Sequence, residues 1–265
     1  MAVDLVGGCR VSVMREGTPH VTGSLSIWNQ VGKATGAQAI SLRVLEFAVG
    51  LSPGLRNQDC DEVLYVLEDP DDAQKAKRCT VFIDGRAHRV QAQTGIYLRP
   101  GQTLMVDNPG PEAICFVSSQ CPEGETGIVP LGSVDLITEP RETADALVRL
   151  ADQREMPTGD RWYCVLVDDQ IGSEQVTQFV GSIPPGRAPD HFHEYEEVLF
   201  ILRGTGRMWT GDKNAPIGPG SCIYLPRGQA HCVENTGDGE LRLLGVFYPA
   251  GSPAVRYDPL TTKGT

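Results

Sequence analysis

The sequence lacks the features of membrane-spanning and nucleic-acid-binding proteins. No apolar run reaches the roughly 20 residues that a membrane-spanning helix needs, and the N-terminus shows no basic start followed by an apolar segment. Lys and Arg number 23 against 34 Asp and Glu, a net charge of −11, and they form no cluster that could follow a phosphate backbone. We therefore expect a soluble, cytoplasmic protein with no membrane or nucleic-acid partner.

Paired cysteines and aromatic side chains are also scarce. The eight cysteines show no CxxC spacing, and a chain of 265 residues can bury a core without disulfide bonds. Aromatic residues make up only 6% of the chain, whereas 30 Gly and 19 Pro separate short runs of Val, Ile, Leu, Phe and Tyr. This composition predicts an all-β protein with many tight turns, and the length favours two domains.

Three blocks of the sequence occur twice, in the same order. LSPG at 51–54 corresponds to IPPG at 183–186, DEVLYVL at 61–67 to EEVLFIL at 196–202, and GIYLRPGQTLMVDN at 95–108 to CIYLPRGQAHCVEN at 222–235. Ordered repetition of this kind indicates a duplicated unit. The sequence therefore predicts two similar β-barrels in tandem.

A different pattern separates the two copies. Residues 138–153, TEPRETADALVRLADQ, begin with a candidate N-cap and an early Pro and place apolar residues at helical spacing. We therefore predict a first domain at 1–135, a helical linker at 136–158 and a second domain at 159–265. Strand-like segments within residues 1–30, CRVSVM and SLSIWNQ, are expected to cross over and complete the sheet of the other half.

The second copy carries three of the five histidines in a two-part pattern. Its fixed positions are Gly186, His191, His193, Glu197 and Gly204, followed by Gly220, Pro226, Gly228, His231 and Asn235. Alternate residues of a strand point to the same side, so His191 and His193 share one space, and a turn brings Glu197 back towards it. The Gly/Pro-rich hairpin then delivers His231 from another strand. Three imidazoles and a carboxylate suit a first-row divalent metal with two open positions.

These residues resemble the two signature motifs of the cupin superfamily, G-x(5)-HxH-x(3,4)-E-x(6)-G and G-x(5)-PxG-x(2)-H-x(3)-N. The second motif matches at every fixed position, and the first is one residue short before His191. The resemblance implies an all-β bicupin, two double-stranded β-helix (jelly-roll) barrels of which the first is a degenerate copy. It also implies one metal per chain on His191, His193, Glu197 and His231, with Fe, Mn, Ni and Zn all open.

The first copy lacks the imidazole ligands. Glu62 corresponds to Glu197, but the loop before Glu62 is three residues shorter and holds no His, and Leu104 takes the position of His231. We expect a metal-free first barrel that serves packing, dimer formation or one wall of the substrate site. The alternative is that Cys60 and Glu62 form a thiol-based site or a second ligand site.

Several functions agree with this metal set, because cupins include dioxygenases, decarboxylases, isomerases, hydrolases and binding proteins. We expect a metal-dependent, dioxygenase-type oxidoreductase acting on a small molecule, with Glu197 as ligand and catalytic base, because no separate acid/base pair is evident. The alternatives are a non-redox hydrolase, isomerase or lyase with the layout of ureidoglycine aminohydrolase, and a non-catalytic metal- or ligand-binding protein.

Charge and strand alternation favour different kinds of substrate. A site charge of about +1 favours an anionic ligand, whereas strand alternation places Leu199, Ile201 and Val233 near the metal and favours an aromatic or otherwise apolar one. A homodimer is expected, because an exposed sheet edge invites association.

Overall fold

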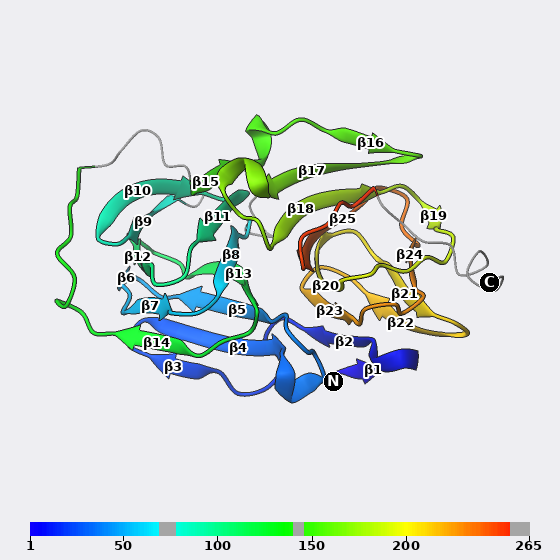
Figure 1. Ribbon diagram of the computed structural model, residues 1–265, viewed down its shortest axis with the longest axis horizontal. Helices are drawn as coiled ribbons and strands as arrows, with labels where there is room; N and C mark the ends of the chain where they lie inside the picture. Colours follow the sequence, from blue (N-terminus) through cyan, green and yellow to red (C-terminus); the bar gives the residue numbers. More distant parts are fainter. Residues whose placement is uncertain (69–77, 140–145, 255–265) are drawn as a thin grey trace.

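The computed structural model describes residues 1–68, 78–139 and 146–254, and these fold almost entirely into β-strands (Figure 1). The strands form two barrels that lie side by side, each built from a larger and a smaller sheet. This arrangement confirms the predicted all-β, tandem jelly-roll architecture. No helix of the described residues is long and apolar enough to cross a bilayer.

The first barrel combines a seven-stranded sheet, in the order β15-β11-β8-β13-β5-β4-β3, with a smaller sheet in the order β10-β9-β12-β7-β14, to which β6 adds. The larger sheet contains β3 (His20–Thr22), β4 (Leu25–Val31), β5 (Leu42–Phe47), β8 (Asp61–Val66), β11 (Thr94–Leu98), β13 (Ile114–Cys121) and β15 (Leu147–Arg149). The smaller contains β6 (Gly50–Leu51), β7 (Gly54–Asn57), β9 (Arg78–Ile83), β10 (Arg86–Gln91), β12 (Thr103–Asn108) and β14 (Thr126–Val129).

The second barrel repeats this plan with an eight-stranded sheet, β1-β2-β23-β20-β25-β18-β17-β16, and a four-stranded sheet, β19-β24-β21-β22. The larger sheet contains β1 (Val3–Asp4), β2 (Arg10–Val13), β16 (Met156–Thr158), β17 (Arg161–Val167), β18 (Thr177–Ile183), β20 (Glu196–Arg203), β23 (Ser221–Leu225) and β25 (Leu241–Tyr248). The smaller contains β19 (Gly186–Arg187), β21 (Gly206–Thr210), β22 (Lys213–Ile217) and β24 (Cys232–Asn235). Single 3-10 turns, η1 (Val6–Gly8), η2 (Lys33–Thr35), η3 (Leu150–Asp152) and η4 (Asp169–Ile171), lie between strands.

Strand register confirms the duplication. Glu62 on β8 lies opposite Leu98 and Gln120, and Glu197 on β20 lies opposite Leu225 and Phe247 in the same manner. Buried apolar side chains form one large cluster inside each barrel, a third between the barrels, and a small fourth around Phe82, Ala87 and Met105 on the smaller sheet of the first barrel. All eight cysteines are free, and seven of them are buried, as expected for small apolar side chains.

The contact between the barrels includes a buried carboxylate. Glu196 accepts hydrogen bonds from the backbone N–H groups of residues 38–40, at 2.8, 2.7 and 3.2 Å, and from the hydroxyl of Tyr224. Asp61 takes the corresponding place in the first barrel and accepts from Tyr97 at 2.7 Å. Because successive side chains of a strand point to opposite faces, Glu196 faces the neighbouring barrel while Glu197 faces the interior.

The N-terminal segment does cross over. β2 pairs with β23, from Arg10 opposite Tyr224 to Val13 opposite Ser221, and the side chain of Val11 is buried in the core of the second barrel. CRVSVM therefore behaves as predicted, whereas SLSIWNQ forms β4 in the larger sheet of the first barrel. The domain limits 1–135 and 159–265 stay a prediction.

The helix predicted for the linker is wrong over its described part. Residues 140–145 lie outside the described residues, but Leu147–Arg149 form β15 and Leu150–Asp152 form a single 3-10 turn. β15 pairs with the edge of β11, with Leu147 opposite Ile96. Hydrogen bonding to that edge and packing of Leu150, which is 8% exposed, outweigh the local helical pattern.

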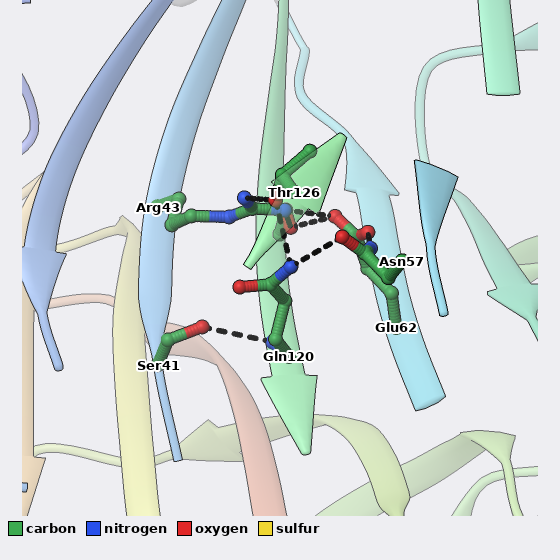
Figure 2. Close-up of polar contacts among 7 residues, drawn as sticks. Ser41, Arg43, Asn57, Glu62, Gln120 and Thr126 are labelled. Carbon is green, nitrogen blue, oxygen red and sulfur yellow. Dashed lines mark hydrogen bonds and ion pairs between the residues drawn. The ribbon is translucent and has the colours of Figure 1, made fainter. Parts of the chain in front are cut away.

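An ion pair fills the first barrel where the second has aromatic rings. In the first barrel Arg43 lies opposite Ser118, and at the equivalent place of the second barrel Phe179 lies opposite Gly245. In the same way, Gln120 of the first barrel takes the position of Phe247 in the second. The Arg43 guanidinium donates to the Glu62 carboxylate (Figure 2). It also donates to the Ser118 hydroxyl at 3.0 Å. The negative charge of Glu62 is therefore balanced by a cation of the chain itself.

Amide and hydroxyl groups complete this cluster. Asn57 donates to the second oxygen of Glu62, and the Gln120 amide donates to Asn57 Oδ1 at 2.7 Å and to Thr126 Oγ1 at 2.8 Å (Figure 2). Arg43 also donates to Thr126 at 2.6 Å. Buried polar groups with this many partners are expected to be costly to disrupt one at a time.

Arg43→Met should lower the free energy of unfolding by about 3–5 kcal/mol, because it leaves Glu62 buried without a counter-charge. Arg43→Met combined with Glu62→Gln should recover most of that loss, since no charge remains and the amide oxygen still accepts from Asn57. Urea denaturation at neutral pH compares the two variants. Equal destabilisation by the single and the double change would contradict the electrostatic account.

Candidate metal centre

Strand pairing brings three imidazoles to one end of the second barrel. His191 and His231 form an isolated antiparallel bridge, in which each backbone N–H donates to the other's carbonyl, at 3.0 and 2.8 Å. The carbonyl of His193 accepts from the N–H of Gly228, in the hairpin that carries His231, at 2.8 Å. One ring nitrogen from each of the three histidines lies within 4.8 Å of the other two. The sequence-predicted histidines therefore meet.

Glu197 joins them from β20. Its Oε2 lies 3.6 Å from Nε2 of His193 and 3.8 Å from Nε2 of His231. The residue is 5% exposed, and Oε2 accepts no hydrogen bond from the described residues. A buried carboxylate oxygen without a donor is unfavourable unless a cation reaches it. The four predicted side chains thus form a set that fits a divalent metal ion.

Burial sets the protonation of this cluster. It raises the pKa of Glu197 to about 8. Burial, together with the nearby His191 and His193, lowers the pKa of His231 to about 3. Near pH 7 without a cation, Glu197 is therefore mainly protonated and His231 is neutral. A neutral imidazole offers a lone pair, and a divalent cation would favour the carboxylate form of Glu197.

Each imidazole is held through its Nδ1. The partners are the carbonyl of Pro189 for His191 at 3.2 Å, the carbonyl of Gln229 for His231 at 2.8 Å, and the hydroxyl of Tyr195 for His193 at 3.0 Å. Hydrogen bonding at Nδ1 orients an imidazole so that Nε2 serves as the metal ligand. The chain thus supplies both the ligand atoms and the groups that orient them.

The cluster opens into a cavity of about 90 Å³. Its apolar lining includes Ile183, Phe179, Leu199, Val233, Leu243 and Phe247. Leu199 and Val233 lie where strand alternation predicted them. Ile201 does not line the cavity and is buried in the surrounding core.

Arg161 is a lining residue that sequence reasoning missed. It begins β17, its side chain is 14% exposed, and it lines the same cavity as the histidines. Its Nε lies 3.5 Å from Asp160, a carboxylate that is 76% exposed. The motifs gave no signal for Arg161, because it lies outside both and reaches the cavity only through the pairing of β17 with β18.

The first barrel offers a different environment at the equivalent place. Glu62 is engaged by Arg43, Asn57 and Ser118, and Leu104, at the position of His231, is buried among apolar side chains. Burial raises the pKa of Cys60 to about 11, so its thiol is protonated and a poor metal ligand. These contacts speak against the thiol-based alternative.

Comparisons with known proteins agree with this geometry. Residues 179–247 match the family described as "Cupin domain". The oxalate-binding protein of Thermotoga maritima is 38% identical over 67 residues, which are 24% of this chain and 55% of that protein. Auxin-binding protein 1 of Arabidopsis thaliana is 31% identical over 86 residues, 29% of this chain and 43% of that protein. The chain thus spans about half the length of the curated relatives it matches.

Solved structures extend the likeness to both barrels. Oxalate decarboxylase from Bacillus subtilis superposes with a TM-score of 0.68 at 15% identity, over 90% of this chain and 75% of that one. A second structure of that enzyme, from work on its Mn(II) centres, gives 0.69 at 14% identity, over 91% and 78%. Identity this low shows the fold alone. Residues 179–247 are therefore a cupin domain, and the chain as a whole has the tandem-barrel fold of a bicupin.

Proposed function

We propose that the chain binds a small dicarboxylate of the oxalate class on a divalent metal held by His191, His193, Glu197 and His231. The observation that carries the proposal is the cavity itself, which combines the unbonded oxygen of Glu197 and the three imidazoles with Arg161. A metal of charge +2, Glu197 at −1 and Arg161 at +1 sum to about +2. An anionic ligand, and a dianion most strongly, would be attracted to this charge.

The size of the cavity supports the same class of ligand. A volume of about 90 Å³ is far below that of pockets for drug-sized molecules, which are roughly 300–1,000 Å³. A dicarboxylate of a few heavy atoms can occupy two adjacent open positions of an octahedral metal. The names of the oxalate-binding relative and of the oxalate decarboxylase are consistent with such a ligand, and the latter's Mn(II) centres make Mn²⁺ the first metal to test.

The residues of the chain have separate roles in this proposal. A bound divalent metal would supply Lewis acidity and hold the carboxylate oxygens. Arg161 would neutralise charge on the ligand by donating from its guanidinium. The rings of Phe179 and Phe247 line the cavity and would exclude water from it, which strengthens these charge interactions.

A second candidate is dioxygenase-type oxidation, with Glu197 as ligand and base. Two observations favour it: the wall around the imidazoles is largely apolar, and the described lining residues include no carboxylate besides Glu197 that could act as a separate acid.

The expected homodimer stays a prediction, supported by the open sheet edges at β3 and β16.

Metal content should be about one ion per chain, all of it in the second barrel. Changing both His191 and His193 to Ala should remove it, because two of four ligands are lost. The Arg43→Met/Glu62→Gln variant, altered at the corresponding place of the first barrel, should keep one ion. Elemental analysis after dialysis gives the stoichiometry, and two ions per chain in the wild type would refute the assignment.

Arg161→Gln should weaken oxalate binding by about 10- to 100-fold, because a charge-assisted hydrogen bond contributes about 1.5–3 kcal/mol. Metal content should not change. Calorimetry with Mn²⁺-loaded protein measures the affinity. The control is Arg227→Gln, which removes the same charge from an exposed arginine that does not line the cavity. If Arg161→Gln bound oxalate as tightly as the wild type, that result would count against the proposed ligand pose.

Dioxygenase-type chemistry predicts that turnover of phenolic or keto-acid substrates stops without dioxygen and that dioxygen is consumed in step with substrate. Assays under argon, with an oxygen electrode for the aerobic arm, decide this. Undiminished anaerobic turnover would exclude the dioxygenase-type function and leave a hydrolase, isomerase or lyase.

A further inference from the structure

Tyr195 connects the metal cluster to the segment after β25. Its ring stacks on His193, with centroids 4.9 Å apart and planes at 11°, and its hydroxyl lies 3.0 Å from Nδ1 of His193. The same hydroxyl lies 3.2 Å from the carbonyl oxygen of Ser252. The residue is 8% exposed and also packs on Phe247, at 4.3 Å between centroids. Tyr195 is therefore a fixed bridge between His193 and Ser252.

The number of protons available fixes the directions of the two hydrogen bonds that the Tyr195 hydroxyl makes. A tyrosine hydroxyl has one proton, and a backbone carbonyl can only accept. Because Tyr195 donates to Ser252, its lone pair is left to accept the Nδ1–H of His193. The lone pair of His193 then lies on Nε2, the atom 3.6 Å from Glu197. If the hydroxyl instead donated to Nδ1, the ring proton would lie on Nε2 and metal coordination there would be blocked.

His193 differs in this respect from the other two imidazoles. The Nδ1 atoms of His191 and His231 meet the backbone carbonyls of Pro189 and Gln229, which can never become donors. Among the Nδ1 contacts described here for the three histidines, only that of His193 is made by a group that can both donate and accept. The tautomer of His193 therefore depends on where the Tyr195 proton points.

The acceptor for that proton is held by the second barrel. The N–H of Gly251 donates to Oγ1 of Thr177, a residue that is 4% exposed, at 3.2 Å. A Cβ added to Gly251 would lie 2.4 Å from the ring of Tyr195, so the segment passes directly over that ring. Pro253 then lines the cavity. The position of residues 251–253 and the direction of the Tyr195 hydroxyl are thus linked.

We propose that Tyr195 is a positioning residue that fixes the metal-binding tautomer of His193, and that residues 251–253 govern it by accepting the Tyr195 proton. This inference rests on the proposed metal site. When the Ser252 carbonyl is in place, His193 presents its lone pair to the cluster. When that carbonyl is displaced, the hydroxyl turns to Nδ1 and the metal is held more weakly.

Tyr195→Phe tests the first half, because it keeps the stacked ring and removes the hydroxyl. Mn²⁺ affinity, measured by competition with a chelator, should fall by about 10- to 100-fold, the usual effect of losing a group that orients a metal ligand. Nitrogen-15 NMR of the metal-free protein should show His193 protonated at Nδ1 in the wild type and a mixture of tautomers in the variant. The control is Tyr65→Phe, a buried tyrosine on β8 of the first barrel that does not line the cavity, and it should bind Mn²⁺ as the wild type does.

Thr177→Val tests the second half, because it removes the acceptor that anchors Gly251. Mn²⁺ affinity should fall several-fold in the wild-type background and not at all in the Tyr195→Phe background, where no hydroxyl remains to be redirected. Equal losses in both backgrounds would overturn control by residues 251–253. Wild-type affinity in Tyr195→Phe would overturn the whole inference. Absence of Mn²⁺ binding by the wild-type chain would instead refute the proposed function.

Discussion

A buried carboxylate that must meet positive charge organises the interior of both barrels. Glu62 and Glu197 occupy the same register on β8 and β20, and neither can ionise cheaply away from water. In the first barrel the cation is Arg43, part of the chain, and the surrounding polar side chains serve the pair. In the second barrel Glu197 faces imidazoles instead. The same register position is therefore paired with a cation of the chain in the first barrel and lies among the residues of the proposed metal site in the second.

The sequence predicts those features that depend on strand periodicity. His191, His193, Glu197 and His231 could be placed together because side chains alternate along strands and the hairpin position is marked by Gly and Pro. Arg161 could not be found in this way, because its approach to the cavity depends on how β17 curves beside β18. Arg43 was missed for a similar reason: an arginine in a strand is ordinarily solvent-exposed, and only the packed barrel shows its partner.

The linker shows where local pattern fails. Residues 147–149 have helical spacing of apolar side chains, yet they pair with the open edge of β11. Long-range hydrogen bonding thus overrides intrinsic preference. By contrast, β20 takes part in two long-range contacts. Glu196 accepts hydrogen bonds from the backbone of residues 38–40, and Glu197 faces the three histidines. Contact between the barrels and geometry of the metal centre therefore share one strand.

The pairing of β2 with β23 has a consequence for biosynthesis. Residues 10–13 leave the ribosome early, but their partners, residues 221–224, are among the later ones translated. The first barrel can fold during synthesis, while residues 10–13 stay unpaired because their partner strand β23 has not yet been made. On neighbouring ribosomes of one messenger RNA, that arm can meet the β23 of a chain further advanced in translation. Exchange of the arm would then leave β2 of one chain paired with β23 of another, so translation order bears on whether this strand pairing forms within a single chain.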